Sequence, residues 1–155
     1  MKSQMPNVSD RLDLAVLQEL EDLKQHPCSP DWRLCGRNQS WIVAETMTLS
    51  GDHASAAQAA TEMATDFTEQ WQESYDAACI MARCVALVRN DEKLPPRERE
   101  RIGKSYCGHA VRFLRSAINH GFHEFGMLEK DPDLAPLRGD TSFKRVLTTA
   151  QRAAG

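Results

Sequence analysis

Apolar residues recur every three or four positions along most of this chain, which is the spacing of one face of an α-helix. The first such run lies between Ser9, a good N-cap residue, and Pro27, which disfavours helical geometry in the residue before it. Its apolar stripe is formed by Leu12, Val16, Leu20 and Leu23. We therefore expect a flexible tail over residues 1–8 and a helix over residues 9–26.

A second helix is expected to begin at Ser29-Pro30-Asp31, where an N-cap residue precedes a proline at the first helical position. It continues to Leu49, with Gly36 as a candidate interruption, and Gly51 is expected to end it in a left-handed conformation. Asp52 can cap a third helix that is rich in alanine. The inward positions of that helix are Ala56, Ala57, Ala60, Met63, Ala64 and Phe67.

Two longer helices follow, one from about residue 69 to residue 88 and one from about residue 96 to residue 119. A charged loop at residues 90–93 separates them. Glu100 and Lys104 have the spacing of an ion pair on one helix face. Gly121 is expected to end the second of these helices, with Phe122 folding back onto it.

The C-terminal part has shorter elements. We expect a short helix around Phe125, tight turns over residues 131–137, and a final helix capped by Asp140 or Thr141. No segment alternates apolar and polar residues as a strand does. The predicted fold is all-α, with six or seven helices packed as antiparallel hairpins in one domain over residues 9–152.

Two stretches of the chain repeat one another. Residues 40–47 align with residues 74–81 at an offset of 34, and each copy has an aromatic residue, then a small residue, then Met. The helices that follow align on Ala56 and Ala110 at an offset of 54, so the second copy carries about 20 extra residues, and this insertion includes residues 88–101. Small residues stand where the helices must approach closely: Ala44, Ala77, Ala78, Ala82, Ala110 and Ala117.

This pattern resembles the tetratricopeptide repeat, a helix–turn–helix unit that stacks into a right-handed superhelix. The resemblance implies units at about residues 38–67 and 71–120 and a C-terminal cap over about residues 123–152. The chain departs from the family pattern in its second turn and at Thr68, where a proline often closes the repeat.

Residues 74–147 are similar to repeat regions that follow the catalytic domain of large bacterial serine/threonine kinases. The shared segments are Tyr75–Cys79, Leu94–Arg99 and Lys130–Arg138. The glycine-rich loop, the His-Arg-Asp loop and the Asp-Phe-Gly motif of a kinase are absent from the sequence. The resemblance therefore implies a scaffold and not phosphoryl transfer.

In such a superhelix the first helix of each unit lines the inner, concave surface. The resemblance implies that these residues are exposed there: Asn38, Trp41, Glu45, Thr48, Gln72, Tyr75, Cys79, Ala82 and Arg83. Helical spacing independently puts Trp41, Glu45 and Thr48 on one face. We expect a groove for a peptide or helix anchored by Trp41 and Tyr75, unless both rings pack against the preceding helix. The Lys and Asn of chaperone-binding relatives are replaced, so no carboxylate clamp is expected.

The net charge of −3 is unevenly spread, because residues 1–70 carry −6 and residues 71–155 carry +3. Five cations form a basic strip on the long helix: Arg97, Arg101, Lys104, Arg112 and Arg115. Glu98 and Glu100 interrupt the strip, and it lacks aromatic stacking residues, so a solvated face is favoured over a nucleic-acid site. An acidic protein partner is the next best use of the strip.

The five cysteines are expected to be free thiols, mostly buried in a reducing compartment. His26, Cys28 and Cys35 have metal-ligand types but lack a paired second half. No signal peptide or membrane span is apparent, so we expect a cytoplasmic protein. We expect no metal and no cofactor.

Catalytic residues are not predicted from this sequence. His53 and His109 are interpreted as polar residues at helix edges, and His120 and His123 as part of a solvated loop. We predict a non-enzymatic adaptor that binds a protein or peptide, with a second copy of the chain as a further candidate partner. The alternatives are a Cys/His metal-dependent sensor or enzyme, and a nucleic-acid-binding protein that uses the basic strip.

Overall fold

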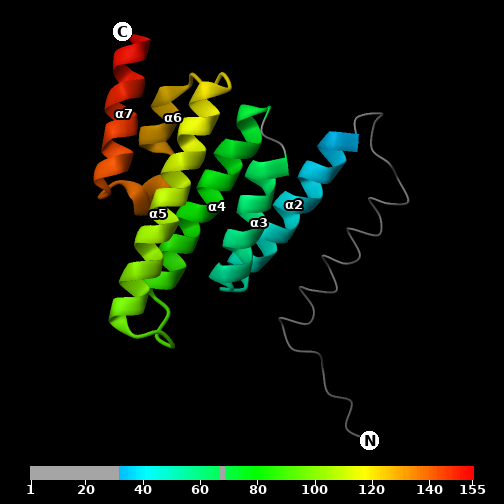
Figure 1. The fold of residues 1–155 in the computed structure, drawn as a ribbon, viewed down its shortest axis with the longest axis vertical. Helices are drawn as coiled ribbons and strands as arrows, with labels where there is room; N and C mark the ends of the chain where they lie inside the picture. The colour runs from blue at the N-terminus through cyan, green and yellow to red at the C-terminus, as the bar shows by residue number, and fades with distance from the viewer. Residues whose placement is uncertain (1–31, 67–68) are drawn as a thin grey trace, which may run out of the picture.

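A computed structural model of the protein describes residues 32–66 and 69–155, with side chains for residues 41–66, 69–153 and 155. Within these residues the chain forms six α-helices and one 3-10 helix and no strand, which confirms the predicted all-α class (Figure 1). In chain order the elements are α2 (Trp32–Leu49), α3 (His53–Asp66), α4 (Trp71–Arg89), α5 (Pro96–Asn119), α6 (Phe125–Lys130), the 3-10 helix η1 (Pro132–Leu137) and α7 (Thr141–Ala154).

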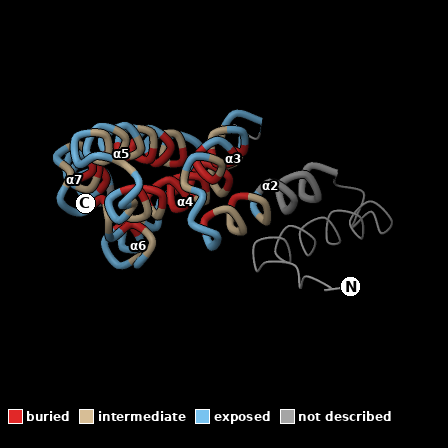
Figure 2. Tube along the Cα trace, turned by 90° about the horizontal axis from the view of Figure 1, so that it is seen from below, coloured by how far each residue is buried: buried red, intermediate tan, exposed pale blue. Residues whose placement is uncertain are grey.

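Consecutive long helices run antiparallel and lie side by side. α2 packs on α3, α4 packs on α5, and α3 joins the two hairpins by packing on α4 (Figure 1). The C-terminal elements then fold back, so that η1 lies on α4 and α7 packs against α5 and α6. α4 therefore has neighbours on most sides, and Figure 2 shows it buried along most of its length.

Two glycines end helices at the predicted positions. Gly51 has a φ of +82° and Gly121 a φ of +107°, a region of backbone space that favours glycine. After Gly121 the chain folds back, because the Phe122 N–H donates to the Ala117 carbonyl at 3.0 Å. The Phe122 ring is buried as a result, as the sequence predicted.

Aspartates cap two of the helices. The Asp52 carboxylate accepts a hydrogen bond from the Ser55 N–H at the start of α3. Hydrogen bonds from Ser55 hold the pKa of Asp52 below its usual value. Asp140 caps α7 by accepting from the Phe143 N–H, so Asp140 and not Thr141 is the cap.

Alanines mark the places where the helices come closest. Ala44, Ala78 and Ala110 are each 0% exposed, as the predicted close approach requires. Gly103 of α5 marks another close approach, since a Cβ added there would lie 3.6 Å from Val88 Cγ1. Small side chains let the backbones approach, and larger apolar side chains fill the space beside them.

One prediction about the helix boundaries is wrong, and others are untested. Gly36 lies inside α2 and does not interrupt it, because a single glycine costs a helix only about 1 kcal/mol relative to alanine. The predicted tail over residues 1–8, the helix over residues 9–26 and Phe67 lie outside the described residues. Among the described helices, none has the length and apolar character needed to cross a membrane.

Replacing Ala78 by Leu should destabilise the fold, because the added atoms must displace closely packed neighbours. We expect a loss of about 1–3 kcal/mol in the free energy of unfolding. Urea denaturation followed by circular dichroism measures this change. Ala54→Leu is the matched control: Ala54 is exposed on α3, so its replacement should change the stability by less than about 0.5 kcal/mol. Equal stability of the two variants would contradict the close approach of the helices.

Candidate functional site

The inner face of α4 is covered by the C-terminal part of the chain. The Tyr75 hydroxyl donates a hydrogen bond to Asp131 Oδ2 at 2.6 Å. The Cys79 thiol, one turn later, lies 3.8 Å from the same oxygen. The segment from Asp131 to Pro136 therefore occupies the face of α4 that was predicted from the sequence to bind a partner.

Asp131 holds this segment in place through both of its carboxylate oxygens. Oδ1 accepts from the Asp133 N–H at 3.0 Å and so caps η1, while Oδ2 accepts from Tyr75. Pro132 occupies the first position of η1, where a missing N–H costs nothing. Burial, together with the hydrogen bond to Asp131, raises the pKa of Tyr75, so the phenol remains a donor at neutral pH.

An aromatic cluster fixes the ring of Tyr75. The ring stacks on Phe122 with 4.9 Å between the ring centroids. Phe122 also contacts Trp71 at 5.2 Å and Phe125 at 6.2 Å. Because these residues come from α4, the turn after α5 and the start of α6, the cluster orients the C-terminal elements against the second hairpin.

A charged pair crosses from α2 to α4. Arg83 donates to the Glu45 carboxylate at 2.5 Å, and both side chains are about three-quarters buried. Asp133 of η1 lies close enough to interact electrostatically with both charged groups. Burial raises the pKa of Asp133, and the nearby Arg83 opposes that rise.

An open depression remains between α2 and η1, above the last turns of α4. Its volume is about 380 Å³. The lining residues are Thr48, Arg83, Ala86, Leu87, Pro132, Asp133, Ala135 and Pro136. We call this depression, together with Glu45, the α2–η1 groove. Trp41 lies one helical turn before Glu45 on the same face of α2 and is 42% exposed.

The predicted inner-face residues therefore divide into two groups. Exposure was expected for all of them, but Thr48, Tyr75, Cys79 and Ala82 are buried, and that expectation was wrong. The three α4 residues among them lie on the face that η1 covers, and Thr48 donates its hydroxyl to the Ala44 carbonyl in its own helix. Trp41 is exposed, Glu45, Gln72 and Arg83 are partly exposed, and the side chain of Asn38 lies outside the described residues.

Three potential metal ligands lie close together on this face. Cys79 Sγ and carboxylate oxygens of Asp131 and Asp133 are all within 4.8 Å of one another. Burial raises the pKa of Cys79, whereas a metal ligand must be a thiolate. Both Asp131 oxygens already accept hydrogen bonds, so a metal ion would compete with the Tyr75 hydroxyl and the Asp133 N–H for their lone pairs. We therefore interpret these residues as a hydrogen-bonded cluster. The predicted candidates His26, Cys28 and Cys35 have no described side chains.

Each ring nitrogen of His53 has a hydrogen-bonding partner, and neither contact was predicted from the sequence. Its Nδ1 lies 2.9 Å from the Tyr106 hydroxyl and its Nε2 lies 3.2 Å from Asp91 Oδ2. Burial raises the pKa of Tyr106 to about 12, so this phenol is neutral at physiological pH. The three residues come from α3, α5 and the turn between α4 and α5. We interpret them as a polar link between the two hairpins.

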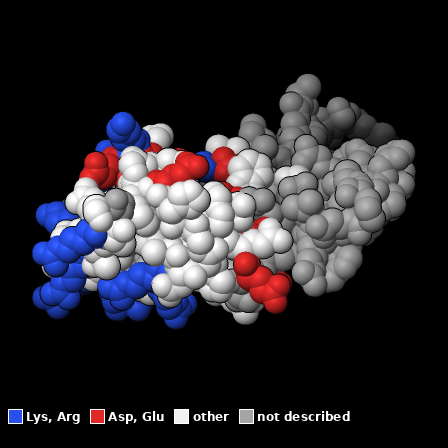
Figure 3. All heavy atoms as spheres, turned by 90° about the horizontal axis from the view of Figure 1, so that it is seen from above, with Lys and Arg blue, Asp and Glu red and all other residues white. Residues whose placement is uncertain are grey.

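The basic strip is exposed, but several of its cations have partners. Arg101 pairs with Glu98 at 2.7 Å, and the predicted pair of Lys104 with Glu100 is confirmed at 2.9 Å. Arg112 contacts the ring of Phe113, with 5.6 Å from its guanidinium carbon to the ring centroid. Figure 3 shows that the cations gather on the side of the molecule formed by α5 and α7.

Comparison with known proteins adds no assignment. No family model, no curated protein and no solved structure matches this chain.

Removing the Tyr75 hydroxyl should release the C-terminal segment from α4. We expect Tyr75→Phe to lower the free energy of unfolding by about 1.5–3 kcal/mol, because the bond goes to a charged acceptor. Urea denaturation of Tyr75→Phe, Asp131→Asn and the double variant forms a double-mutant cycle. Strictly additive losses would show that the two side chains do not interact.

The buried thiols should be inert in the folded protein. Burial raises the pKa of Cys79, Cys84 and Cys107, and that of Cys84 reaches about 12. At pH 8 only about one Cys84 in 10⁴ is then a thiolate, the reactive form. Iodoacetamide labelling mapped by mass spectrometry should modify these three residues only after unfolding in urea. Labelling of any of them under native conditions, at the rate seen in urea, would contradict their burial.

Proposed function

We propose that this chain is a non-enzymatic binding module that holds a segment of a partner protein in the α2–η1 groove. The observation that carries the proposal is the exposed ring of Trp41, which shares one face of α2 with the groove residues Glu45 and Thr48. The Arg83–Glu45 ion pair of the groove is mostly buried. Tryptophan is among the residues that most often dominate binding energy at interfaces. Large apolar side chains with such exposure are few among the described residues, namely Trp41, Leu49 and Met127.

The groove favours a partner segment with a particular chemistry. Glu45 and Asp133 contribute two acidic groups and Arg83 contributes one basic group, so the ionised groove carries a net charge of −1. A cationic side chain therefore complements it better than an anionic one. Leu87, Pro132 and Pro136 supply apolar contact area. A segment with a Lys or Arg close to an apolar residue meets both requirements.

The chain itself supplies a precedent for this mode of binding. The segment Asp131–Pro136, with two prolines, already lies along the inner face of α4. That face thus accommodates a short, proline-containing segment through hydrogen bonds and apolar packing. A partner segment in the adjoining groove would use the same kind of contact.

Several further expectations belong to this proposal. The alanine-lined antiparallel hairpins support a tetratricopeptide-like adaptor, and the three buried free thiols support a reducing compartment such as the cytoplasm. The three described cysteines, Cys79, Cys84 and Cys107, are buried with raised pKa values, which disfavours a thiol nucleophile. Two of the five cations in the basic strip pair with glutamates, which favours a protein partner over nucleic acid.

Replacing Trp41 should remove the partner. We expect Trp41→Ala to weaken binding about 30-fold or more, the usual effect of losing an aromatic anchor. Affinity capture from lysate of the source organism, followed by mass spectrometry, compares this variant with the unmodified chain. If the partner is a second copy of the chain, the oligomeric state of the purified protein reports the binding, and Trp41→Ala should change that state.

Leu49→Ala is the matched control. Leu49 is another exposed apolar residue of α2, about two helical turns from Trp41. Partners should be lost with Trp41→Ala and retained with Leu49→Ala. If both variants fold normally and retain the same partners, the groove is not the binding site.

A further inference from the structure

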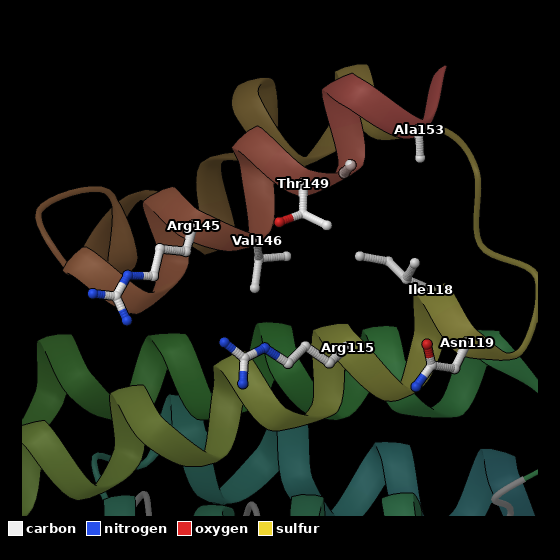
Figure 4. A pocket seen from close by; sticks show the side chains of 8 residues that line it. Arg115, Ile118, Asn119, Arg145, Val146, Thr149 and Ala153 are labelled. Carbon is white, nitrogen blue, oxygen red and sulfur yellow. The ribbon is translucent and has the colours of Figure 1, made fainter. Parts of the chain in front are cut away.

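A second, separate pocket lies between α5 and α7, on the side of the molecule where the cations gather (Figures 3 and 4). Its volume is about 260 Å³. Apolar side chains from both helices form much of its wall, namely Ile118, Val146, Ala150 and Ala153. Figure 4 shows the Arg115 and Arg145 guanidinium groups at one end of the pocket, with Ile118 and Ala153 at the other.

These two arginines have no compensating charge among the described residues. Neither forms a hydrogen bond or an ion pair with a described residue, whereas Arg101 and Lys104 of the same helix α5 pair with glutamates. The remaining polar residues of the pocket, Asn119 and Thr149, are neutral. Two guanidinium groups beside an apolar wall form a site that is complementary to an anion carried next to an apolar group.

The size and lining of the pocket restrict its occupant further. Pockets for drug-sized small molecules usually measure about 300–1,000 Å³, so this one fits one or two apolar side chains. Its lining contains no aromatic side chain on which a nucleic-acid base could stack. Arginine binds carboxylates through two parallel hydrogen bonds, which suits the side chain of Glu or Asp.

We infer that the α5–α7 pocket binds an acidic segment of a partner protein. One apolar side chain of that segment enters the space beside Val146 and Ala150, and a neighbouring carboxylate pairs with Arg115 and Arg145. The α2–η1 groove favours a cationic segment, so the two sites select partner segments of opposite charge. The chain can then hold two different partners at once, and this inference does not depend on the groove being occupied.

Minimal peptides test the inference by nuclear magnetic resonance. The probe is acetyl-Glu-Leu-Glu-amide, and its two controls are acetyl-Gln-Leu-Gln-amide, without charge, and acetyl-Glu-Ala-Glu-amide, without the large apolar side chain. Backbone amide resonances of the full, isotope-labelled chain are followed during titration. The probe should bind with a dissociation constant in the range of about 1–10 mM and shift the amides of residues 115–119 and 145–153.

The charge of the probe and the two arginines should both matter. Each control peptide should bind about tenfold more weakly than the probe, because one lacks the carboxylates and the other lacks the large apolar side chain. Arg115→Gln and Arg145→Gln should each weaken the probe about tenfold as well. Arg97→Gln, which removes another exposed arginine of α5 outside the pocket, should have no effect.

Three results would overturn the inference. The first is the absence of any shift of these amides at probe concentrations up to about 20 mM, which exceeds the expected dissociation constant. The second is equal binding of the charged and uncharged peptides, which would leave the arginines without a role. The third is a shift of the same amides by a DNA dodecamer but not by the tripeptide, which would assign the surface to nucleic acid.

Discussion

The hydrogen bond between Tyr75 and Asp131 fixes the C-terminal segment against α4, and the proposed α2–η1 groove depends on this arrangement. It joins the second turn of the central helix to a residue 56 positions later, and Asp131 caps the start of η1. Because a buried phenol and a carboxylate both lose water on folding, their mutual bond must replace the lost hydration. The C-terminal segment is therefore held on the inner face of α4, and the α2–η1 groove lies between that segment and α2.

The packing of α4 explains why this arrangement has few alternatives. α4 contacts α2, α3, α5 and η1, and alanines at its crowded positions let those neighbours approach. Such an interior tolerates little added volume. α5 and α7 differ from α4, since each buries one stripe of apolar side chains and exposes a polar face that carries arginines. The α2–η1 groove and the α5–α7 pocket both lie at boundaries between these elements.

Local features of the fold could be predicted from the sequence, whereas contacts between distant segments could not. Gly51, Gly121 and Asp52 each act within a few residues, so their turn and cap roles follow from residue type and spacing. Helical periodicity also placed Tyr75 and Cys79 on one face, but periodicity cannot show which segment covers that face. The links of Tyr75 to Asp131 and of His53 to Tyr106 span more than 50 residues and depend on tertiary packing. Arg115 was predicted in the basic strip, but its place in one pocket with Arg145 of another helix needed the structure.

The contact between Tyr75 and Asp131 can be measured directly in solution. A nuclear Overhauser cross-peak between the ring protons of Tyr75 and the β-protons of Asp131 is the decisive observation. The cross-peak between the Gly103 α-protons and the Val88 methyl groups serves as the internal reference for the second hairpin. We predict that both cross-peaks are present. If the reference cross-peak is seen and the Tyr75–Asp131 cross-peak is absent, the C-terminal segment does not lie on α4, which contradicts this account of the groove.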